Sequence, residues 1–352
     1  MNEFVYVAQP MRVLFGIGTL KKLVSEIDLL GARKALVLST PAQAADAERV
    51  AAQLGARAAG VFAKAVMHVP IETAREARAL AQRLGADCAL AIGGGSTIGL
   101  GKAIALESGL PILAIPTTYA GSEMTPIYGL TEGGEKRTGR DVRVLPRTVI
   151  YDPELTLSLP LGLSITSGMN AIAHAAEGLY AKDGNPIMDV MAEEGIRAMA
   201  GALPKLKANP ADLDARSSAL YGAWLCGAVL GSVGMALHHK LCHTLGGSFN
   251  LPHAEVHTVI LPHSIAYNAP AIPSALARLS RALGSDRPAA ALYDLARNNG
   301  APYELRAIGM AESDLDRAAD LAVANPYWNP RPIERNAIRA LLQDAWEGKR
   351  PS

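Results

Sequence analysis

The pattern of apolar and polar positions changes character near residue 160. Before that point, short apolar runs alternate with longer amphipathic stretches. The runs typical of strands are 34–39, 58–62, 88–92, 111–115 and 148–151, and the helical stretches include 42–54 and 71–84. Buried strands separated by helices of about a dozen residues are typical of a mostly parallel sheet covered on both faces. We therefore expect an α/β domain over residues 1–160, with the polar, Gly-rich segment 131–147 as an antiparallel excursion or loop.

Beyond residue 160 the apolar positions follow helical spacing, with many Ala, Leu and Met residues and few β-branched runs. The predicted helices are 165–181, 186–204, 213–233, 235–245, 254–266, 273–283, 288–298, 312–324 and 332–347. This pattern predicts an all-helical domain over residues 161–352. Small-molecule sites concentrate between domains, so we expect the active site in the interdomain cleft.

Composition supports two domains and narrows the class of protein. The chain has 352 residues, and single cores stop growing at roughly 250–300 residues. A net charge of +1 favours neither a nucleic-acid surface nor a membrane patch. No apolar run approaches the roughly 20 residues of a spanning helix, and the first residues do not resemble a signal peptide, so we expect a cytoplasmic protein.

The three cysteines are widely spaced and form no CxxC pair, which favours reduced thiols over disulfides. Cys242 lies next to His243 and is a conceivable nucleophile. A buried thiol on a helix is the more common situation, and we favour that interpretation.

A glycine-rich turn follows the run at 88–92 and opens a helix, with the sequence GGGSTIGLGK at 93–102. Glycines let a backbone approach a pyrophosphate, and a helix N-terminus offers unpaired N–H groups. The spacing differs from GxGxxG, so a simple tight turn is an alternative. Hydroxyls after the next strand favour a dinucleotide site. The candidate residues are Gly94, Gly95, Ser96, Thr117, Thr118 and Ser122.

Thr40 follows the first clear strand, where dinucleotide folds often place an acid on the ribose 2′-hydroxyl. A threonine does not repel a 2′-phosphate. The sequence therefore leaves both NADH and NADPH open as cofactors.

Histidines gather in three motifs of the predicted helical domain. These motifs are NAIAH at 170–174, HHKLCH at 238–243 and NLPH at 250–253. Residues four apart share a helix face, so Asn170 should lie near His174, and His239 near His243. A lone histidine is usually a core or surface residue, but five of the eight lie within 238–257. Three imidazoles with one carboxylate would suit a divalent transition metal, yet a neutral amide, Asn170, occupies the position one turn before His174.

Four ordered motifs resemble the iron-dependent (group III) alcohol dehydrogenase family: GGGST at 93–97, IPTTYAGSE at 115–123, NAIAHAAE at 170–177 and HHKLCHTLGGSFNLPH at 238–253. The resemblance covers about residues 10–350. It implies the dehydroquinate synthase-like fold, with an α/β NAD(P)-binding domain before an all-α domain, and a homodimer. The family holds its metal with an Asp and three His, which match Asn170, His174, His239 and His253. His243 matches a further histidine implicated in proton transfer or substrate binding.

Two departures from the family pattern matter: Asn170 replaces the metal-binding Asp, and Gly99 replaces the acid of the glycine motif. Together with TTYAGSEMTP at 117–126 and NPYWNPRP at 325–332, they resemble one branch. Its enzymes reduce the double bond of 2-maleylacetate to 3-oxoadipate in aromatic-compound degradation and are thought not to need a metal. On this resemblance we expect the histidines to stabilise an enolate oxygen and supply a proton, with His243 or His253 as the donor.

A dicarboxylate substrate also needs polar and cationic partners. Asn170 removes a negative charge from the pocket, and Tyr119 is a candidate for contact with nicotinamide or substrate. The basic candidates are Lys240, Arg140, Arg143 and Arg331, of which Arg331 is favoured. Each basic residue is individually more typical of a solvated surface.

Three rival functions remain. The nearest is a metal-dependent alcohol or glycerol dehydrogenase that uses Asn170 as a ligand, together with His174, His239 and His253. A lyase of the dehydroquinate synthase type would need an intact zinc site and several lysines around a phosphate. A cofactor-binding protein without catalysis is the third, and the four retained histidines disfavour it.

Overall fold

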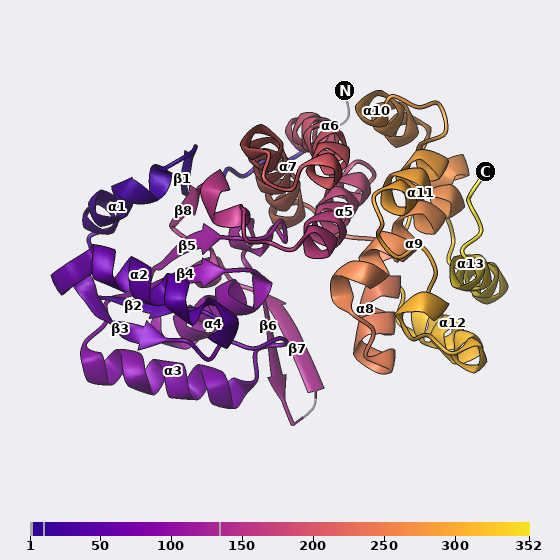
Figure 1. Ribbon diagram of the computed structural model, residues 1–352. Coiled ribbons are helices and arrows are strands. Elements are labelled where there is room, and N and C mark those ends of the chain that lie inside the picture. The colour runs from indigo at the N-terminus through magenta and orange to yellow at the C-terminus, as the bar shows by residue number, and fades with distance from the viewer. Residues whose placement is uncertain (1–2, 10, 134) are drawn as a thin grey trace. The chain divides into compact units, whose positions relative to one another are not determined.

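The computed structural model describes residues 3–9, 11–133 and 135–352. The chain divides into two compact units: Ala8–Leu159 forms one, and Pro160–Ser352 makes up most of the other. We call them the α/β unit and the helical unit and describe each by itself (Figure 1).

In the described part of the α/β unit, parallel strands form a six-stranded sheet in the order β1-β8-β5-β4-β2-β3. The strands are β1 (Arg12–Phe15), β2 (Ala35–Leu38), β3 (Ala58–Phe62), β4 (Cys88–Gly93), β5 (Ile112–Pro116) and β8 (Thr148–Tyr151). The expected parallel sheet is confirmed. The polar excursion is an antiparallel hairpin of β6 (Ile127–Glu132) and β7 (Glu135–Arg140).

Successive residues of a strand point to opposite faces of the sheet, and the central strands are apolar at nearly every position. Both faces are therefore apolar, and helices cover both. The helices are α1 (Leu23–Leu29), α2 (Ala44–Leu54), α3 (Ile71–Leu84) and α4 (Gly95–Ser108). On one face, Leu90 and Ile92 of β4 pack with α1 and α2; on the other, Ala89 packs with α3 and α4. Figure 1 shows α3 beneath the sheet edge at β3.

The helical unit contains no strand among the residues described. Its helices are α5 (Leu161–Gly178), α6 (Pro186–Ala208), α7 (Leu213–Ser232), α8 (Leu237–Phe249), α9 (His253–Asn268), α10 (Pro273–Leu283), α11 (Pro288–Asn298), α12 (Leu315–Ala324) and α13 (Arg335–Glu347). Leucine and alanine side chains from α8, α9, α12 and α13 form one buried core. The all-helical prediction for this half is therefore confirmed.

Several predicted details differ from the structure. The helix predicted over 235–245 is α8, which continues to Phe249 and ends at Asn250 in the left-handed conformation, φ 54°. β1 and α1 were not predicted, since both are short and β1 is largely solvent-accessible.

Within the described residues, no single helix is long and apolar enough to cross a membrane. α7 and α8 meet those criteria only as a pair bent by 96°.

Candidate functional site

At Gly93 and Gly94, between β4 and α4, a side chain would meet its neighbours closely. A Cβ on Gly93, whose φ is 148°, would lie 2.6 Å from Thr97 Oγ1 and 2.8 Å from Gln43 Oε1. A Cβ on Gly94 would lie 2.9 Å from Thr118 Cγ2. The turn therefore keeps its backbone bare at the carboxyl end of β4, which is where ligands bind in open α/β sheets.

Polar groups converge beside this turn. Gly94 is the N-cap of α4 and supplies no side-chain cap, so the helix N-terminus is left to offer its N–H groups to a ligand. Thr97 Oγ1 is buried and has no hydrogen-bond partner among the described residues. Gln43 Nε2 donates to Thr117 Oγ1 at 3.0 Å, and Thr40 Oγ1 donates to Gln43 Oε1 at 3.4 Å. A bare backbone, open N–H groups and an unpartnered hydroxyl fit the phosphates and ribose of a dinucleotide.

Sequence reasoning missed Gln43 and Thr97 in this region. Ser96 lies in the first turn of α4, and Gly95 has open space around its Cβ position, with only Ala120 Cβ at 4.0 Å. Tyr119 is fully buried. Ser122 begins a short 3-10 helix, where its carbonyl accepts a hydrogen bond from Lys102.

The helical unit brings the predicted histidines together. His174 of α5 and His239 of α8 are both buried, and His174 Nδ1 lies 2.9 Å from His239 Nε2. The rings of His239 and His243 are 5.9 Å apart between centroids. His253, the first residue of α9, has its ring 4.4 Å from that of His257. The last ring of the group is that of His257, 4.9 Å from His239.

Glu177 organises this cluster and was not assigned a role from the sequence. Its carboxylate is fully buried and accepts hydrogen bonds from Ala236 N at 2.9 Å and His238 N at 2.7 Å, so it caps the start of α8. The same carboxylate lies 2.7 Å from His239 Nδ1. Glu177 stands three residues after His174, on the same helix face, and that spacing was the available signal.

The chain Glu177–His239–His174 has two protonation states with different chemistry. In both states, His239 donates a hydrogen bond from its protonated Nδ1 to the carboxylate of Glu177. If both rings are neutral, His174 must donate to His239 Nε2, and His174 Nε2 is an acceptor. If one proton is added, His239 donates to His174 Nδ1, and His174 Nε2 becomes a donor. One added proton therefore changes His174 Nε2 from an acceptor into a donor.

A second buried chain fixes two other histidines. Ser264 Oγ donates to Leu261 O at 2.9 Å, so His238 Nδ1, 3.2 Å away, must donate to Ser264. His257 Nδ1 then donates to His238 Nε2 at 2.9 Å, which leaves His257 Nε2 as an acceptor with no partner in the described part of the chain. The opposite direction would bury an unpaired N–H group, at greater cost. Burial and the neighbouring histidines hold the pKa of both rings well below the usual value, so they are neutral.

Cys242 is part of this second chain and is not a nucleophile. Its Sγ lies 3.6 Å from His238 Nε2, and burial raises the thiol pKa well above its usual value. His238, Cys242 and His257 bring three conceivable metal-ligand atoms within 4.8 Å of one another. The ring nitrogens between His238 and His257 are occupied by their mutual hydrogen bond, so this group is a hydrogen-bonded network. All three cysteines are buried and free, as expected.

Two of the candidate cations occupy different surroundings. His243 is exposed and lies 3.0 Å from Tyr327 Oη, and Lys240 Nζ stands 5.9 Å from the centre of the Tyr327 ring. Lys240 is therefore next to His243. Arg331 stacks on Tyr267 at 4.1 Å and donates to Tyr267 O at 2.7 Å.

Arg331, the arginine favoured from the sequence, therefore makes these contacts outside the histidine cluster. Arg331 lines a cavity of about 420 Å³ near the C-terminus together with His263 and Asp344. In the α/β unit, Arg143 is paired with Asp141 through Nη2 at 2.7 Å.

Asn170 lies where the sequence predicted, on α5 one turn before His174. Its side chain is buried, and its Oδ1 atom has no hydrogen-bond partner among the residues that the structure describes. Such an atom is available to a hydrogen-bond donor on a ligand or to an ion.

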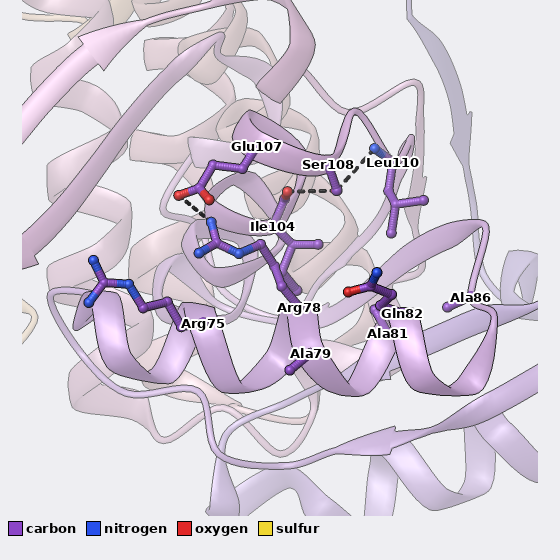
Figure 2. Close-up of a pocket in the computed structure, with 10 residues that line it drawn as sticks. All are labelled: Arg75, Arg78, Ala79, Ala81, Gln82, Ala86, Ile104, Glu107, Ser108 and Leu110. Atoms are coloured by element: carbon purple, nitrogen blue, oxygen red, sulfur yellow. Dashed lines mark hydrogen bonds and ion pairs between the residues drawn. The ribbon is translucent and has the colours of Figure 1, made fainter.

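A hollow of about 580 Å³ lies elsewhere on the α/β unit, between α3 and α4 (Figure 2). Two of its polar side chains have protein partners: Arg78 is paired with Glu107, and Ser108 Oγ donates to Ile104 O at 2.7 Å. No predicted site residue lines it.

A parallel sheet with a bare glycine turn, joined in one chain to a helical histidine cluster, defines a dinucleotide-dependent oxidoreductase. Comparison with known proteins places the chain within that class. Residues 10–153 match the model of iron-containing alcohol dehydrogenases, and residues 164–346 match the C-terminal model of the same family. The chain belongs to the iron-containing alcohol dehydrogenase family.

Several relatives that cover the whole chain are maleylacetate reductases. The chain is 68% identical to a maleylacetate reductase of Burkholderia cepacia over 100% of both chains, and 60% identical to one of Pseudomonas sp. strain P51 over 99% of both. The crystal structure of maleylacetate reductase from Agrobacterium tumefaciens has a TM-score of 0.98 at 57% identity and covers 100% of both chains. The enzyme is therefore an oxidoreductase.

The family name raises the question of whether the cluster fits iron or another divalent metal. The donor set lacks a carboxylate, since Asn170 is neutral. His174 Nδ1 and His239 Nε2 are hydrogen-bonded at 2.9 Å, whereas nitrogens sharing one tetrahedral ion lie about 3.3 Å apart. These residues fit a divalent metal poorly.

Proposed function

We propose that this enzyme uses NADH or NADPH to reduce the carbon–carbon double bond of 2-maleylacetate, giving 3-oxoadipate, during aromatic-compound degradation. The observation that carries the proposal is the Glu177–His239–His174 chain, a switchable donor built from protein groups where relatives of the family hold a metal. The name of several full-length relatives, maleylacetate reductase, supports the same substrate.

The α/β unit supplies the cofactor site. Gly94, Gly95 and Ser96 would hold the pyrophosphate at the start of α4, with the hydroxyls of Thr117, Thr118 and Ser122 beside it. The bound nicotinamide supplies a hydride. Thr40, half-buried and bonded to Gln43, places no carboxylate against a ribose 2′-phosphate, so both cofactors should be accepted.

The histidine chain supplies electrophilic assistance. As hydride adds to the double bond, negative charge moves to the oxygen of the conjugated ketone. A preorganised donor at that oxygen lowers the barrier, typically by a few kcal/mol. His174 would be this donor, through the Nε2–H that it carries when the Glu177–His239–His174 chain has gained a proton. Because Asn170 is neutral, it adds no second carboxylate that would repel the substrate.

Proton delivery to the adjacent carbon completes the reduction. His243 and His253 are the solvent-exposed members of the cluster and so can be reprotonated after each turnover. His243 stands beside Tyr327 and Lys240, which would favour a carboxylate nearby.

One observation favours a second function. Unpartnered Asn170 Oδ1 is a conceivable ligand, so a metal-dependent alcohol dehydrogenase using Asn170, His174, His239 and His253 is the alternative.

The deciding experiment follows NADH oxidation with freshly generated maleylacetate, using protein dialysed against EDTA and assayed for metal. We expect rapid turnover at less than 0.1 metal per chain, about the limit of a contaminant. Failure to reduce maleylacetate, together with alcohol oxidation restored by Fe²⁺ or Zn²⁺, would establish the alternative. A homodimer in the cytoplasm remains part of the proposal and is checked by light scattering and fractionation.

A further inference from the structure

A lysine is fully buried inside the α/β unit, in the middle of α4. Lys102 Nζ lies 2.6 Å from Ser122 O, 2.7 Å from Ile127 O, and 2.8 Å from both the carbonyl and the hydroxyl oxygen of Thr125. Its side chain is 1% exposed. None of the reactions described above uses this residue.

The contacts of Lys102 suit an ammonium group. An ammonium carries three N–H donors and no acceptor, and every partner here is an oxygen. Burial lowers the pKa of Lys102, and the buried carboxyl of Glu123 opposes that shift. Glu123 is itself bonded to Tyr151, whose hydroxyl donates to Oε1 at 2.7 Å. Through these four oxygens the single side chain of Lys102 contacts the chain at three residues, Ser122, Thr125 and Ile127.

The segment that Lys102 holds is one wall of the proposed dinucleotide site. Residues 117–127 leave the end of β5, begin with Thr117 and Thr118, and return to β6. Thr118 lies against Gly94, where an added Cβ would be 2.9 Å from its Cγ2 atom. The other wall is the N-terminus of α4, seven residues before Lys102 on the same helix.

We propose that Lys102 is a positioning residue for the dinucleotide site: its side chain ties the 117–127 segment to α4 and so sets the spacing between Thr118 and the glycine turn. The identity of the ligand rests on the proposed function, but the tie itself does not.

The test replaces Lys102 by Ala and measures NADH binding directly from nicotinamide fluorescence. We expect the Kd for NADH to rise at least tenfold, while kcat with saturating NADH falls less than threefold. The deletion leaves space for three carbons and an amine, so propylammonium chloride should restore binding. Tetramethylammonium chloride at equal concentration has no N–H group and should not.

The exposed Lys64, paired with Glu76, gives the matched control: Lys64→Ala should leave the Kd unchanged. If Lys102→Ala does not fold, Thr125→Val decides, because it removes one of the four oxygens; an increase in Kd of about threefold is expected. Unchanged NADH affinity in a folded variant would overturn the proposal. Normal NADH binding by the natural enzyme without reduction of maleylacetate would instead count against the proposed function alone.

Discussion

At the scale of single residues, Asn170 separates the two candidate functions most sharply. Asn170→Asp restores the anionic ligand that the family pattern contains, next to His174 and His239. We expect the variant to retain Zn²⁺ or Fe²⁺ after desalting, near one ion per chain. We also expect kcat/KM for maleylacetate to fall at least tenfold, about 1.4 kcal/mol, because a carboxylate would repel the dicarboxylate substrate.

Asn170→Ala is the control for this prediction, since it removes the amide without adding charge. Elemental analysis and steady-state kinetics on all three proteins distinguish the effects. An Asp variant that binds no metal and keeps full activity would show that the charge at this position is irrelevant.

Most residues in the cluster could be found from the sequence, but their relations could not. The histidine motifs and helical spacing were enough to place Asn170 beside His174. The role of Glu177 depends on the backbone of Ala236, 59 positions away, and no local pattern encodes such a contact. His238 and His257 were given no role from the sequence, yet they form a buried chain with Ser264.

At the scale of elements, the packing of α6 on α7 depends on glycines. A Cβ on Gly222 would lie 2.9 Å from both Gly195 O and Met199 N, so the two backbones touch. We expect Gly222→Ala to lower the free energy of unfolding by at least about 1–3 kcal/mol. The atoms that the new methyl group would meet belong to the backbone and cannot move aside as a flexible side chain can. Urea denaturation followed by circular dichroism measures the change.

Gly201 supplies the matched control. It is an exposed residue of α6, and nothing lies within 4 Å of its Cβ position. Gly201→Ala should stabilise the protein by about 0.5–1 kcal/mol through helix propensity. Equal effects at the two positions would contradict the close-packing argument.

The boundaries of elements were predictable where periodicity is strong. α3, α10 and α11 begin and end where the pattern places them. The end of α8 was mispredicted because a glycine inside a helix carries only a modest penalty, which tertiary packing of Leu245 and Phe249 outweighs.

At the scale of the whole molecule, the fold class followed from one change in periodicity, from alternating short runs to continuous helical spacing. The strand order did not follow, because parallel strands pair through crossovers whose partners lie far apart in sequence. The same applies to the site: residues 43, 97 and 102 acquire meaning only when the sheet brings strand ends together.

Buried neutral histidines also make the stability of the helical unit depend on pH. Burial lowers the pKa of His263 to about 4, against about 6.5 in the unfolded chain. Between those values the unfolded state binds one more proton, so the free energy of unfolding falls as pH decreases from 6.5 towards 4. The full effect is on the order of 3 kcal/mol, and His238 and His257 act in the same direction.

Thermal denaturation of His263→Gln across pH 4–7 tests this linkage. The variant should lose less stability on acidification than the natural protein. The slope of its free energy of unfolding against pH should be smaller by the equivalent of up to one bound proton. His68→Gln, which removes an exposed histidine, should leave the pH dependence unchanged. If His263→Gln retained the full acid slope, the linked protons would belong to other groups. The protein would then owe its acid sensitivity to the cluster itself, where His238 and His257 must stay neutral for their chain of hydrogen bonds to exist.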